Sequence, residues 1–354
     1  MPAPGSDIER SSGPVSLEDL RAPFAEELER IDELMNDQLM PDNPILEAAV
    51  SANTTTRGKR MRPLLLLLSA EATGGINDIH LQVGAILELI HAATLVHDDV
   101  LDQGEFRRQH ITVNEKFGNE LAVLFGDFIF SNAYILTVEL ERKDVRMILS
   151  NTARDVCKGE IWQTGNKFNY DLDESTYLEF IRLKTASLFA ACGELGATIN
   201  GADQKTVNAF KRFGSSFGMA FQIVDDYLDL IGEEDLVGKS LGTDLHKGKL
   251  TLPVLELFSK MDPEEKEEAV ELISSYGREG EGTADHVSED DIEERRLLRE
   301  AFTRWLEKYD LLEGKSEYAG EYLDKAREEL TGLGDHEAVD HIERLIDFAE
   351  QRYR

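Results

Sequence analysis

The sequence predicts an all-α fold in a single domain. Apolar residues recur at spacings of three and four along five long runs, which is the period of a helix packed against a core. β-Branched residues seldom alternate with polar ones in these runs, so half-buried strands are not expected. No helical repeat of fixed period and no linker between segments of different composition divides the chain. The runs are 81–103, 119–141, 176–199, 204–231 and 248–261.

Signals at the ends of the helices set the remaining boundaries. Residues 1–15 are rich in Pro, Gly and Ser and are expected to form a disordered tail, which leaves 16–354 for the domain. An acidic residue three positions after Ser16 is typical of a helix start. Glycine and acidic residues at 277–294 predict an exposed acidic loop. Other breaks are predicted at 72–78, 116–120, 166–175, 200–203 and 232–249.

The charge of the chain restricts its partners and its surroundings. Its 70 acidic residues outnumber its 38 basic ones, which gives a formal net charge of −32. Such a surplus disfavours nucleic acid and anionic lipid as partners. Because salt screens the repulsion between these charges, the surplus predicts a halophilic, haloarchaeal host with a salt-rich cytosol.

Neither the cysteines nor the apolar runs indicate secretion or stable membrane insertion. Cys157 and Cys192 lack the spacing of a zinc site or a disulfide scaffold, so both are expected to be small buried hydrophobes. No basic region followed by an apolar one occurs near the N-terminus. The longest unbroken apolar run, 63–68, is too short to span a bilayer, and we expect a cytoplasmic protein.

The first acidic motif lies at the end of a helical run. The stretch "HAATLVHDDVLD" at 91–102 carries Asp98, Asp99 and Asp102 among apolar residues. On a helix, positions four apart lie about 40° apart, so Asp98 and Asp102 are expected to project together. Like charges at this spacing destabilise a helix by roughly a few tenths of a kcal/mol. Taken alone, the motif is equally typical of a solvated acidic face.

The same pattern occurs a second time, which favours a shared function. "FQIVDDYLDLIG" places Asp225, Asp226 and Asp229 in similar apolar surroundings. Carboxylates without His or Cys favour Mg²⁺ or Mn²⁺, and Mg²⁺ commonly completes its coordination with substrate phosphates. The two motifs therefore predict a metal site that a bound diphosphate completes. An EF-hand is excluded because its alternating ligands, central Gly and terminal Glu are missing.

Basic residues gather around both acidic motifs. Each of them is typical of a surface side chain when it is taken singly. Their placement around the two motifs favours a diphosphate site instead. They are Arg57, Lys59, Arg60, Arg62, Arg107, Arg108, Lys184, Lys239 and Lys249.

These motifs together resemble those of the trans-isoprenyl diphosphate synthases of the polyprenyl synthetase family, with octaprenyl-type synthases as the nearest pattern. The matching segments, in the family's order, are "GKRMRP", "HDDVLD" followed by "RR", "GDFIF", "KT", "FQIVDDYLD" and "GKSLGTDLHKGKLTLP". The resemblance covers roughly residues 20–350. It implies an isoprenoid synthase helical bundle around a central catalytic cavity, usually as a homodimer. Arg57 before Gly58 and Gln109 after the arginine pair depart from the family pattern, without removing a charged contact.

The resemblance also implies a reaction and a role for each site residue. The reaction is the Mg²⁺-dependent head-to-tail condensation of isopentenyl diphosphate with allylic diphosphates, which gives all-trans polyprenyl diphosphates. Three Mg²⁺ ions would be bound by Asp98, Asp102 and Asp225, with further or water-mediated ligation by Asp99, Asp226, Asp229 and Asp244. Contacts to the allylic diphosphate would come from Arg107, Lys184, Lys239 and Lys249. The carbocation would be stabilised by oxygens of Thr185, Gln222 and the Lys184 main chain. Isopentenyl diphosphate would be bound by Lys59, Arg62, His91 and Arg108.

Product length depends, by the same resemblance, on residues that precede the first motif. In short-chain members an aromatic residue closes the product tunnel four or five positions before the motif. Thr94 and Ala93 stand there and are small, with Ile90 one turn further along. This favours a medium or long product. A short-chain product, geranylgeranyl or farnesyl diphosphate, stays open because a neighbouring helix can supply the tunnel floor.

Several alternatives stay open from the residues alone. His91 is also typical of a histidine packed inside a helical core. Phe125, Phe128, Phe130 and Tyr134 have the helical spacing of core residues, although some could line the tunnel. A terpene cyclase shares the metal-triggered ionisation but needs no isopentenyl site. A non-catalytic regulatory subunit often lacks one acidic motif, whereas this chain has both.

Overall fold

Helices form most of the chain. The computed structural model describes residues 15–53, 58–107, 110–232, 241–277, 289–312, 317–331, 333 and 337–351. Within these ranges, the short strands β1 (Phe106–Arg107) and β2 (His110–Ile111) form one antiparallel pair. The all-α prediction is confirmed.

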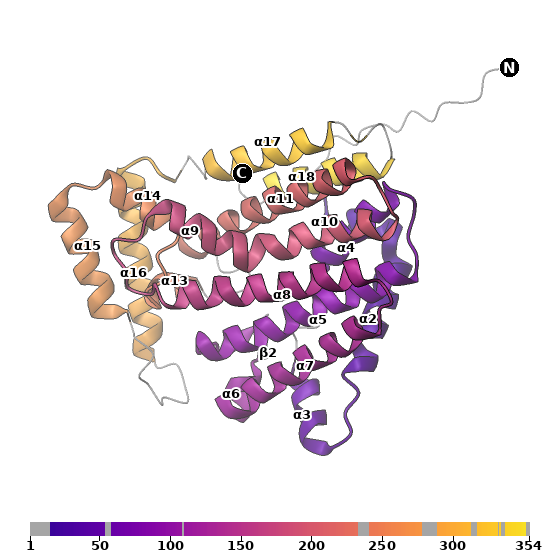
Figure 1. Ribbon diagram of the computed structural model, residues 1–354. Helices are drawn as coiled ribbons and strands as arrows, with labels where there is room; N and C mark the ends of the chain where they lie inside the picture. The colour runs from indigo at the N-terminus through magenta and orange to yellow at the C-terminus, as the bar shows by residue number, and fades with distance from the viewer. Residues whose placement is uncertain are drawn as a thin grey trace.

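The helices follow one another along the chain in the order that the colours of Figure 1 show. The first half contains α1 (Leu17–Arg21), the 3-10 turn η1 (Ala22–Phe24), α2 (Ala25–Gln38), α3 (Pro44–Ala52), α4 (Met61–Glu71), α5 (Asp78–Leu101), α6 (Val113–Phe117), α7 (Asn119–Glu139) and α8 (Lys143–Thr164). The second half contains α9 (Glu174–Ile181), the π-helix η2 (Arg182–Ala186), α10 (Ser187–Ile199), α11 (Gln204–Ile231), α13 (Thr243–His246), α14 (Leu252–Lys260), α15 (Pro263–Tyr276), α16 (Glu289–Lys308), α17 (Glu317–Leu330) and α18 (Glu337–Gln351).

The five helical runs lie close to their predicted positions. The run 204–231 coincides with α11, and the others begin within four residues of the prediction. The predicted start near Ser16 is confirmed, because its hydroxyl oxygen accepts a hydrogen bond from the Asp19 amide at 3.1 Å. The run 176–199 differs in one respect, since the π-helix η2 interrupts it. π-Helices are rare and occur mostly as short insertions in α-helices, and the apolar spacing did not indicate this one.

The predicted acidic loop at 277–294 is wrong in its last six residues. α16 already begins at Glu289, and 278–288 lie outside the described residues. Acidic side chains in a first helical turn are favoured by the helix dipole, so a run of them also fits a helix start. Later turns of α16 bury Leu298 and Phe302 in the core, which holds the helix in place.

Two other predicted segments lie only partly within the described residues. Of the predicted tail, 1–14 fall outside them. The predicted break at 232–249 contains 233–240, which are also outside, and the short helix α13, which the sequence did not indicate.

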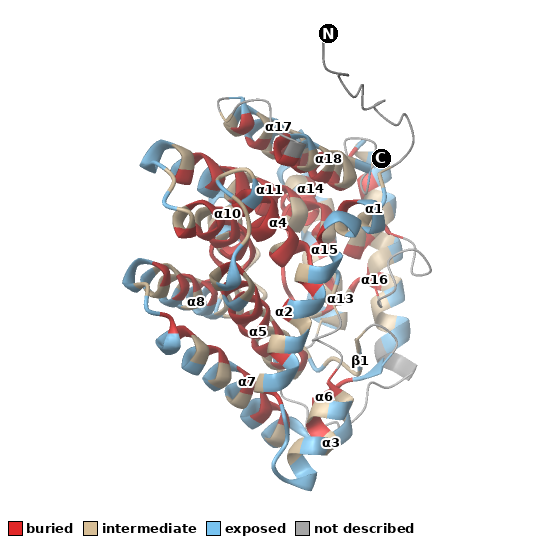
Figure 2. Cartoon of the chain, turned by 90° about the vertical axis from the view of Figure 1, so that its right-hand side faces the viewer, coloured by how far each residue is buried: buried red, intermediate tan, exposed pale blue. Residues whose placement is uncertain are grey.

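The core lies where α4, α5, α10 and α11 meet (Figure 2). α10 packs against α11, α4 and α8, while α5 packs against α7 and α2. A second apolar cluster joins α9 and the end of α11 to α14, α15 and α16. The two acidic motifs therefore lie at the ends of core helices, with α14 to α16 at the same end of the bundle (Figure 1).

Two glycines allow α10 and α11 to approach closely. A Cβ atom on Gly193 would lie 2.2 Å from the Phe210 carbonyl oxygen, and one on Gly214 would lie 2.2 Å from the Phe189 carbonyl oxygen. Real Cβ atoms do not come this close to backbone, so both positions require a residue without a side chain. The reciprocal contacts show that the two helices run antiparallel and fix their register.

α5 and α7 are the two described helices that are long and apolar enough to cross a bilayer by composition. Most of the apolar window of α5 is buried in the core, whereas most of the window of α7 is not. A buried core helix meets the same compositional test, so this finding is weak evidence for a membrane span.

α7 presents part of its apolar surface to solvent. Phe125 is buried and Phe128 is half-buried, but Phe130 and Tyr134 are 36% and 63% exposed. The core interpretation of this spacing therefore fits Phe125 but not Phe130 and Tyr134. α7 is apolar on more than one face, so its periodicity does not show which face meets α5. On the neighbouring α8, Cys157 is exposed as well, contrary to the prediction, while Cys192 is buried.

Candidate functional site

The first acidic motif meets lysines from distant parts of the chain. Asp98 lies in the last turn of α5, and Asp102 is its C-cap residue. The Asp98 carboxylate lies 3.6 Å from the Lys184 ammonium, and Lys249 donates a 2.7 Å hydrogen bond to Asp102 Oδ2. Lys167 lies 4.0 Å from Asp102 Oδ1. The structure therefore places Asp98, Asp102, Lys184 and Lys249 together, as the sequence predicts, and adds Lys167 to them.

The charges of this cluster change one another's pKa. Burial alone would raise the pKa of Asp102, but the ammonium groups of Lys249 and Lys247 outweigh it and hold that pKa below its usual value. Burial would lower the pKa of Lys184, but Asp98 and Glu160 outweigh it and raise that pKa. Asp102 and Lys184 are consequently charged at neutral pH, whereas burial raises the pKa of Asp98.

Asp99 has a different partner from the other two aspartates of its motif. Arg107 donates hydrogen bonds from Nε to both carboxylate oxygens of Asp99, at 2.9 and 3.1 Å, and from Nη2 to Oδ1 at 2.7 Å. The β1–β2 pair and the Thr112 hydroxyl, which donates to the Gly104 carbonyl, hold this turn against the end of α5. Arg107 thus lies beside the motif, as predicted. The residue that holds it there is Asp99, which was predicted to bind metal.

The π-helix η2 carries Lys184 and Thr185 into the site. A Cβ atom on Gly159 of α8 would lie 2.6 Å from the Lys184 backbone nitrogen, so only a glycine permits this contact. From the next turns of α8, Glu160 forms an ion pair with Lys184, and Gln163 Oε1 accepts its hydrogen bond at 3.2 Å. None of these three α8 residues was predicted from the sequence. Their spacing on one helix face was the available signal.

The second motif contains one half-buried carboxylate and two buried ones. Asp225 is half-buried, whereas Asp226 and Asp229 are 5% and 3% exposed. Asp229 accepts 3.2 Å hydrogen bonds from the Thr243 hydroxyl and the Asp244 amide, so it organises the start of α13. Burial, with the nearby Asp244 charge, raises the pKa of Asp226 to about 7.

Thr185 and Gln222, the predicted carbocation contacts, lie in direct contact. The Thr185 hydroxyl donates to Gln222 Oε1 at 2.8 Å, and Gln222 Nε2 donates to Asp226 Oδ1 at 2.7 Å. Tyr177 donates a 2.6 Å hydrogen bond to Asp226 Oδ2. Tyr177 was not predicted as a site residue. Its seven-residue separation from Lys184, two turns along the helical run, was the only signal in the sequence.

The predicted isopentenyl diphosphate residues are only partly placed by the structure. Arg62 lies in the first turn of α4 with its guanidinium 4.7 Å from the centroid of the Phe189 ring, and burial lowers its pKa. Lys59 is exposed just before α4, and His91 is half-buried on α5. Arg108, like Lys239 of the allylic set, lies outside the described residues.

Arg60, between Lys59 and Arg62, has a structural position. Its backbone has a φ of 55°, in the left-handed region, where it caps α4. Its guanidinium forms ion pairs with Asp32 at 2.6 Å and with the buried Glu88 at 2.7 Å. This bridge ties the basic segment to α2 and α5, and so restrains its two neighbours.

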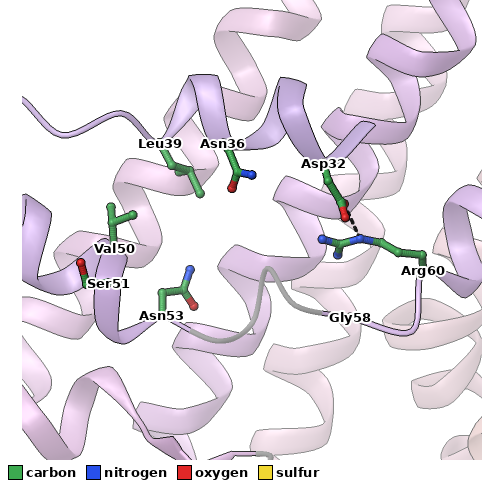
Figure 3. A pocket seen from close by; sticks show the side chains of 8 residues that line it. All are labelled: Asp32, Asn36, Leu39, Val50, Ser51, Asn53, Gly58 and Arg60. Carbon is green, nitrogen blue, oxygen red and sulfur yellow. Dashed lines mark hydrogen bonds and ion pairs between the residues drawn. The ribbon is translucent and has the colours of Figure 1, made fainter. Parts of the chain in front are cut away.

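A cavity of about 520 Å³ lies beside this segment. Figure 3 shows Arg60 and Asp32 facing each other at one side of it, with Asn53 and Ser51 at another. Of the basic residues that the sequence groups around the acidic motifs, Arg60 lines it. The lining residues are Asp32, Asn36, Leu39, Val50, Ser51, Asn53, Gly58 and Arg60.

The residues predicted to govern product length lie on the core side of α5. Ile90 and Ala93 are buried, and Thr94 is half-buried with its hydroxyl donating to the His91 carbonyl at 2.8 Å. All three are on the N-terminal side of Asp98, as expected. Their effect on the product stays a prediction.

Comparison with known proteins identifies the family. The family model described as polyprenyl synthetase matches residues 43–290. The octaprenyl diphosphate synthase of Escherichia coli is 30% identical over 340 residues, which cover 96% of this chain and 100% of that protein. The short chain isoprenyl diphosphate synthase of Methanothermobacter thermautotrophicus is 31% identical over 329 residues, which cover 92% and 94%.

A solved structure shows the same arrangement of helices. The decaprenyl diphosphate synthase of Rhodobacter capsulatus superimposes with a TM-score of 0.84 at 31% identity, over 96% of this chain and 100% of that one. The named relatives differ in product length but share one reaction class. The chain therefore belongs to the polyprenyl synthetase family and is a prenyltransferase that elongates all-trans prenyl chains.

Proposed function

We propose that the chain condenses isopentenyl diphosphate with allylic diphosphates, head to tail, at the cluster where α5, η2 and the segment after α13 meet. The observation that supports this most directly is the pairing of Asp98 with Lys184 and of Asp102 with Lys249. Carboxylates and ammonium groups in one buried cluster suit a ligand that carries both metal ions and phosphate oxygens.

Mg²⁺, or Mn²⁺ in its place, fits the donor set. Within the described ranges, no three acidic, His or Cys side chains converge closely enough to hold a metal by themselves. Asp102 Oδ1, however, is buried and has no hydrogen-bond partner there, so it can accept a cation. Asp98, Asp102 and Asp225 would bind the metal, three ions by the resemblance. Bound metal would supply charge neutralisation for the leaving diphosphate.

The cationic side chains of the chain would bind the allylic diphosphate. Lys184 and Lys249 already lie beside the first motif, and Arg107 is oriented by Asp99. Cations held where negative charge develops stabilise the departure of diphosphate more than they stabilise the substrate. Lys239 would complete this set. Its position lies outside the described residues.

The carbocation left at C1 would face oxygen atoms. Thr185 and Gln222 are hydrogen-bonded to each other at 2.8 Å, beside Lys184. Isopentenyl diphosphate would bind to Lys59, Arg62, His91 and Arg108, with its double bond directed at C1. The Arg62 Nε atom is buried without a hydrogen-bond partner among the described residues, which suits a phosphate contact.

The product would be of medium or long chain, with geranylgeranyl or farnesyl diphosphate as the alternative. Support comes from the small side chain of Ala93 and from the buried apolar surface of Ile90 behind it. One turn of helix corresponds to about 5.4 Å, which is comparable with one isoprene unit.

The protein would act as a cytoplasmic homodimer in a salt-rich cell, without nucleic acid partners. The exposed apolar face of α7 supports self-association, because an apolar surface of this kind favours burial against a partner. It includes Val123, Leu124, Phe130, Tyr134, Ile135 and Val138.

The test is condensation by the purified chain. It is incubated in high salt with Mg²⁺, labelled isopentenyl diphosphate and several allylic starters, and the dephosphorylated products are sized. Products well beyond twenty carbons support the proposal for length, and termination at twenty carbons or fewer supports the alternative. No condensation with any starter contradicts the proposed function. A variant with Lys59 and Arg62 replaced by Met should lose condensation, whereas a cyclase would keep its activity.

A further inference from the structure

A continuous line of hydrogen bonds connects three helical elements behind the second acidic motif. Tyr177 of α9 donates to one oxygen of Asp226, and Gln222 of α11 donates to the other oxygen. Gln222 in turn accepts from Thr185 of η2. Tyr177 and Asp226 are 1% and 5% exposed, so water does not compete for these bonds.

The order of donors and acceptors along this line fixes the amide of Gln222. Asp226 Oδ1 accepts from the amide nitrogen of Gln222 at 2.7 Å, and Tyr177 donates to Oδ2, so the amide oxygen of Gln222 points away from Asp226. The amide oxygen must then face Thr185, whose hydroxyl hydrogen points toward it. The lone pairs of the Thr185 oxygen are directed away from this hydrogen.

Tyr177 holds Asp226 in the orientation that these hydrogen bonds require. Its hydroxyl occupies the second carboxylate oxygen at 2.6 Å and so restrains the rotation of the carboxylate. Without that hydroxyl, a buried oxygen would lose its donor, and the carboxylate would rotate to find another. Such a rotation releases Gln222 as well, since both contacts depend on one rigid plane.

We propose that Tyr177 and Asp226 are positioning residues that hold the Gln222 and Thr185 oxygens toward the allylic carbocation. This inference rests on the proposed function. It assigns to Asp226 an effect on the cation, through Gln222, in place of direct metal binding. Electron-rich oxygens accelerate the ionisation only if they are oriented before the charge forms.

The test removes one oxygen atom with Tyr177→Phe. We expect kcat to fall about tenfold, with both KM values within about twofold of wild type, because one orienting hydrogen bond is lost and no substrate contact. More of the allylic substrate should become alcohol. In that side reaction the C1–O bond to diphosphate breaks, water forms the new C1–O bond, and the proton of that water is released to solvent.

Tyr318→Phe is the matched control. Tyr318 also donates a 2.6 Å hydrogen bond to a carboxylate, that of Glu174, outside the site. This variant should keep the kcat and the alcohol fraction of wild type. Both variants should bind a non-ionising thiolo-diphosphate analogue with the wild-type Kd in calorimetry, since the inference concerns orientation and not binding.

A double-variant cycle separates positioning from a general structural effect. If Tyr177 acts through Gln222, then Tyr177→Phe combined with Gln222→Ala should be no slower than Gln222→Ala alone. If the two losses multiply, the inference is overturned. Should Tyr177→Phe fail to fold, as judged by circular dichroism, Asp226→Asn replaces it in the cycle with the same expectation.

The remaining outcomes are also decisive. If wild type and Tyr318→Phe condense the substrates while Tyr177→Phe matches them in kcat and alcohol fraction, the inference fails and the proposed function stands. If wild type forms neither condensation product nor alcohol, the proposed function fails, and the inference fails with it.

Discussion

Arg107 and Asp99 form a bidentate ion pair at the end of α5, with guanidinium nitrogens 2.7 to 3.1 Å from the carboxylate oxygens. Planar pairs of this kind fix the direction of the arginine as well as its charge. The third guanidinium nitrogen, Nη1, takes no part in this pair and is available for a phosphate. If Arg107 binds the allylic diphosphate as proposed, Asp99 would act on the substrate through Arg107.

Replacing Asp99 with Asn should weaken the binding of the allylic substrate. Arg107 loses its charged partner and its fixed direction, so the KM for the allylic diphosphate should rise about tenfold, which corresponds to about 1.4 kcal/mol. The KM for isopentenyl diphosphate should not change. Steady-state kinetics with each substrate varied in turn measures both. A higher Mg²⁺ requirement with an unchanged allylic KM would show instead that Asp99 binds metal.

Replacing Lys249 with Met should reduce both stability and substrate affinity. The Lys249 ammonium is buried and donates to Asp102 at 2.7 Å, so its loss leaves a largely buried carboxylate with less compensation. We expect a loss of about 2 kcal/mol in the free energy of unfolding, measured by denaturant titration in high salt. Lys205→Met, at an exposed position in the first turn of α11, is the control and should be neutral. Equal stability of the two variants would contradict this role of the ion pair.

Replacing Gly159 with Ala should disturb the π-helix. The new methyl group would lie 2.6 Å from the Lys184 nitrogen and 2.9 Å from Leu183 Cβ, and backbone cannot give way cheaply. We expect about 1–3 kcal/mol of destabilisation and at least about a tenfold loss of kcat, since Lys184 and Thr185 move. Gly320→Ala, with nothing within 4 Å of the added atom, should stabilise the protein by about 0.5–1 kcal/mol. A Gly159→Ala protein of wild-type kcat would exclude this steric requirement.

The free energy of unfolding should decrease as the pH is lowered, because His80 is buried in its neutral form. Its Nδ1 accepts from the Asn77 amide and its Nε2 contacts the Gly196 carbonyl, which together fix the neutral tautomer with hydrogen on Nε2. Burial lowers the pKa of His80 below its ordinary value of 6.5, so just below pH 6.5 the unfolded chain binds a proton that the folded chain does not. Stability is complete above the unfolded pKa and decreases below it, by at most about 1.4 kcal/mol per pH unit.

His80→Gln isolates this contribution. The variant should be less stable than wild type at pH 8, because Gln does not reproduce both contacts, and the difference should narrow between pH 6.5 and pH 5. Denaturant titrations of both proteins at several pH values, at one salt concentration, measure the difference. A difference that does not vary with pH would show that His80 does not titrate in this range.

The sequence predicted the helices better than their surroundings. Period and end signals placed α5 and α11, and the residues within them brought Asp98 and Asp102 together as expected. The same helical period did not predict which face of α7 is buried. Its apolar residues surround the helix, so the exposed Tyr134 and the buried Phe125 have the same pattern in the sequence.

The charged residues of the candidate site were predicted from the sequence, whereas the residues that form hydrogen bonds and ion pairs with them were not. Lys184 and Lys249 were found because cations near acidic motifs are conspicuous in an acidic chain. Glu160 contacts Lys184 and Tyr177 contacts Asp226, and such contacts depend on packing between elements that are distant in the sequence. No local pattern specifies that packing.

The antiparallel contact between α10 and α11 also sets the relative positions of Thr185 and Gln222. Thr185 precedes Gly193 by eight residues, and Gln222 follows Gly214 by the same number. Thr185 therefore lies about 12 Å along the bundle from Gly193, and Gln222 lies about 12 Å from Gly214 in the same direction. The absence of side chains at the two glycines thus sets how the helices pack, and with it where the Thr185 hydroxyl meets the Gln222 amide. A methyl group at either glycine would push the helices apart and displace these two side chains relative to each other, although neither glycine contacts them.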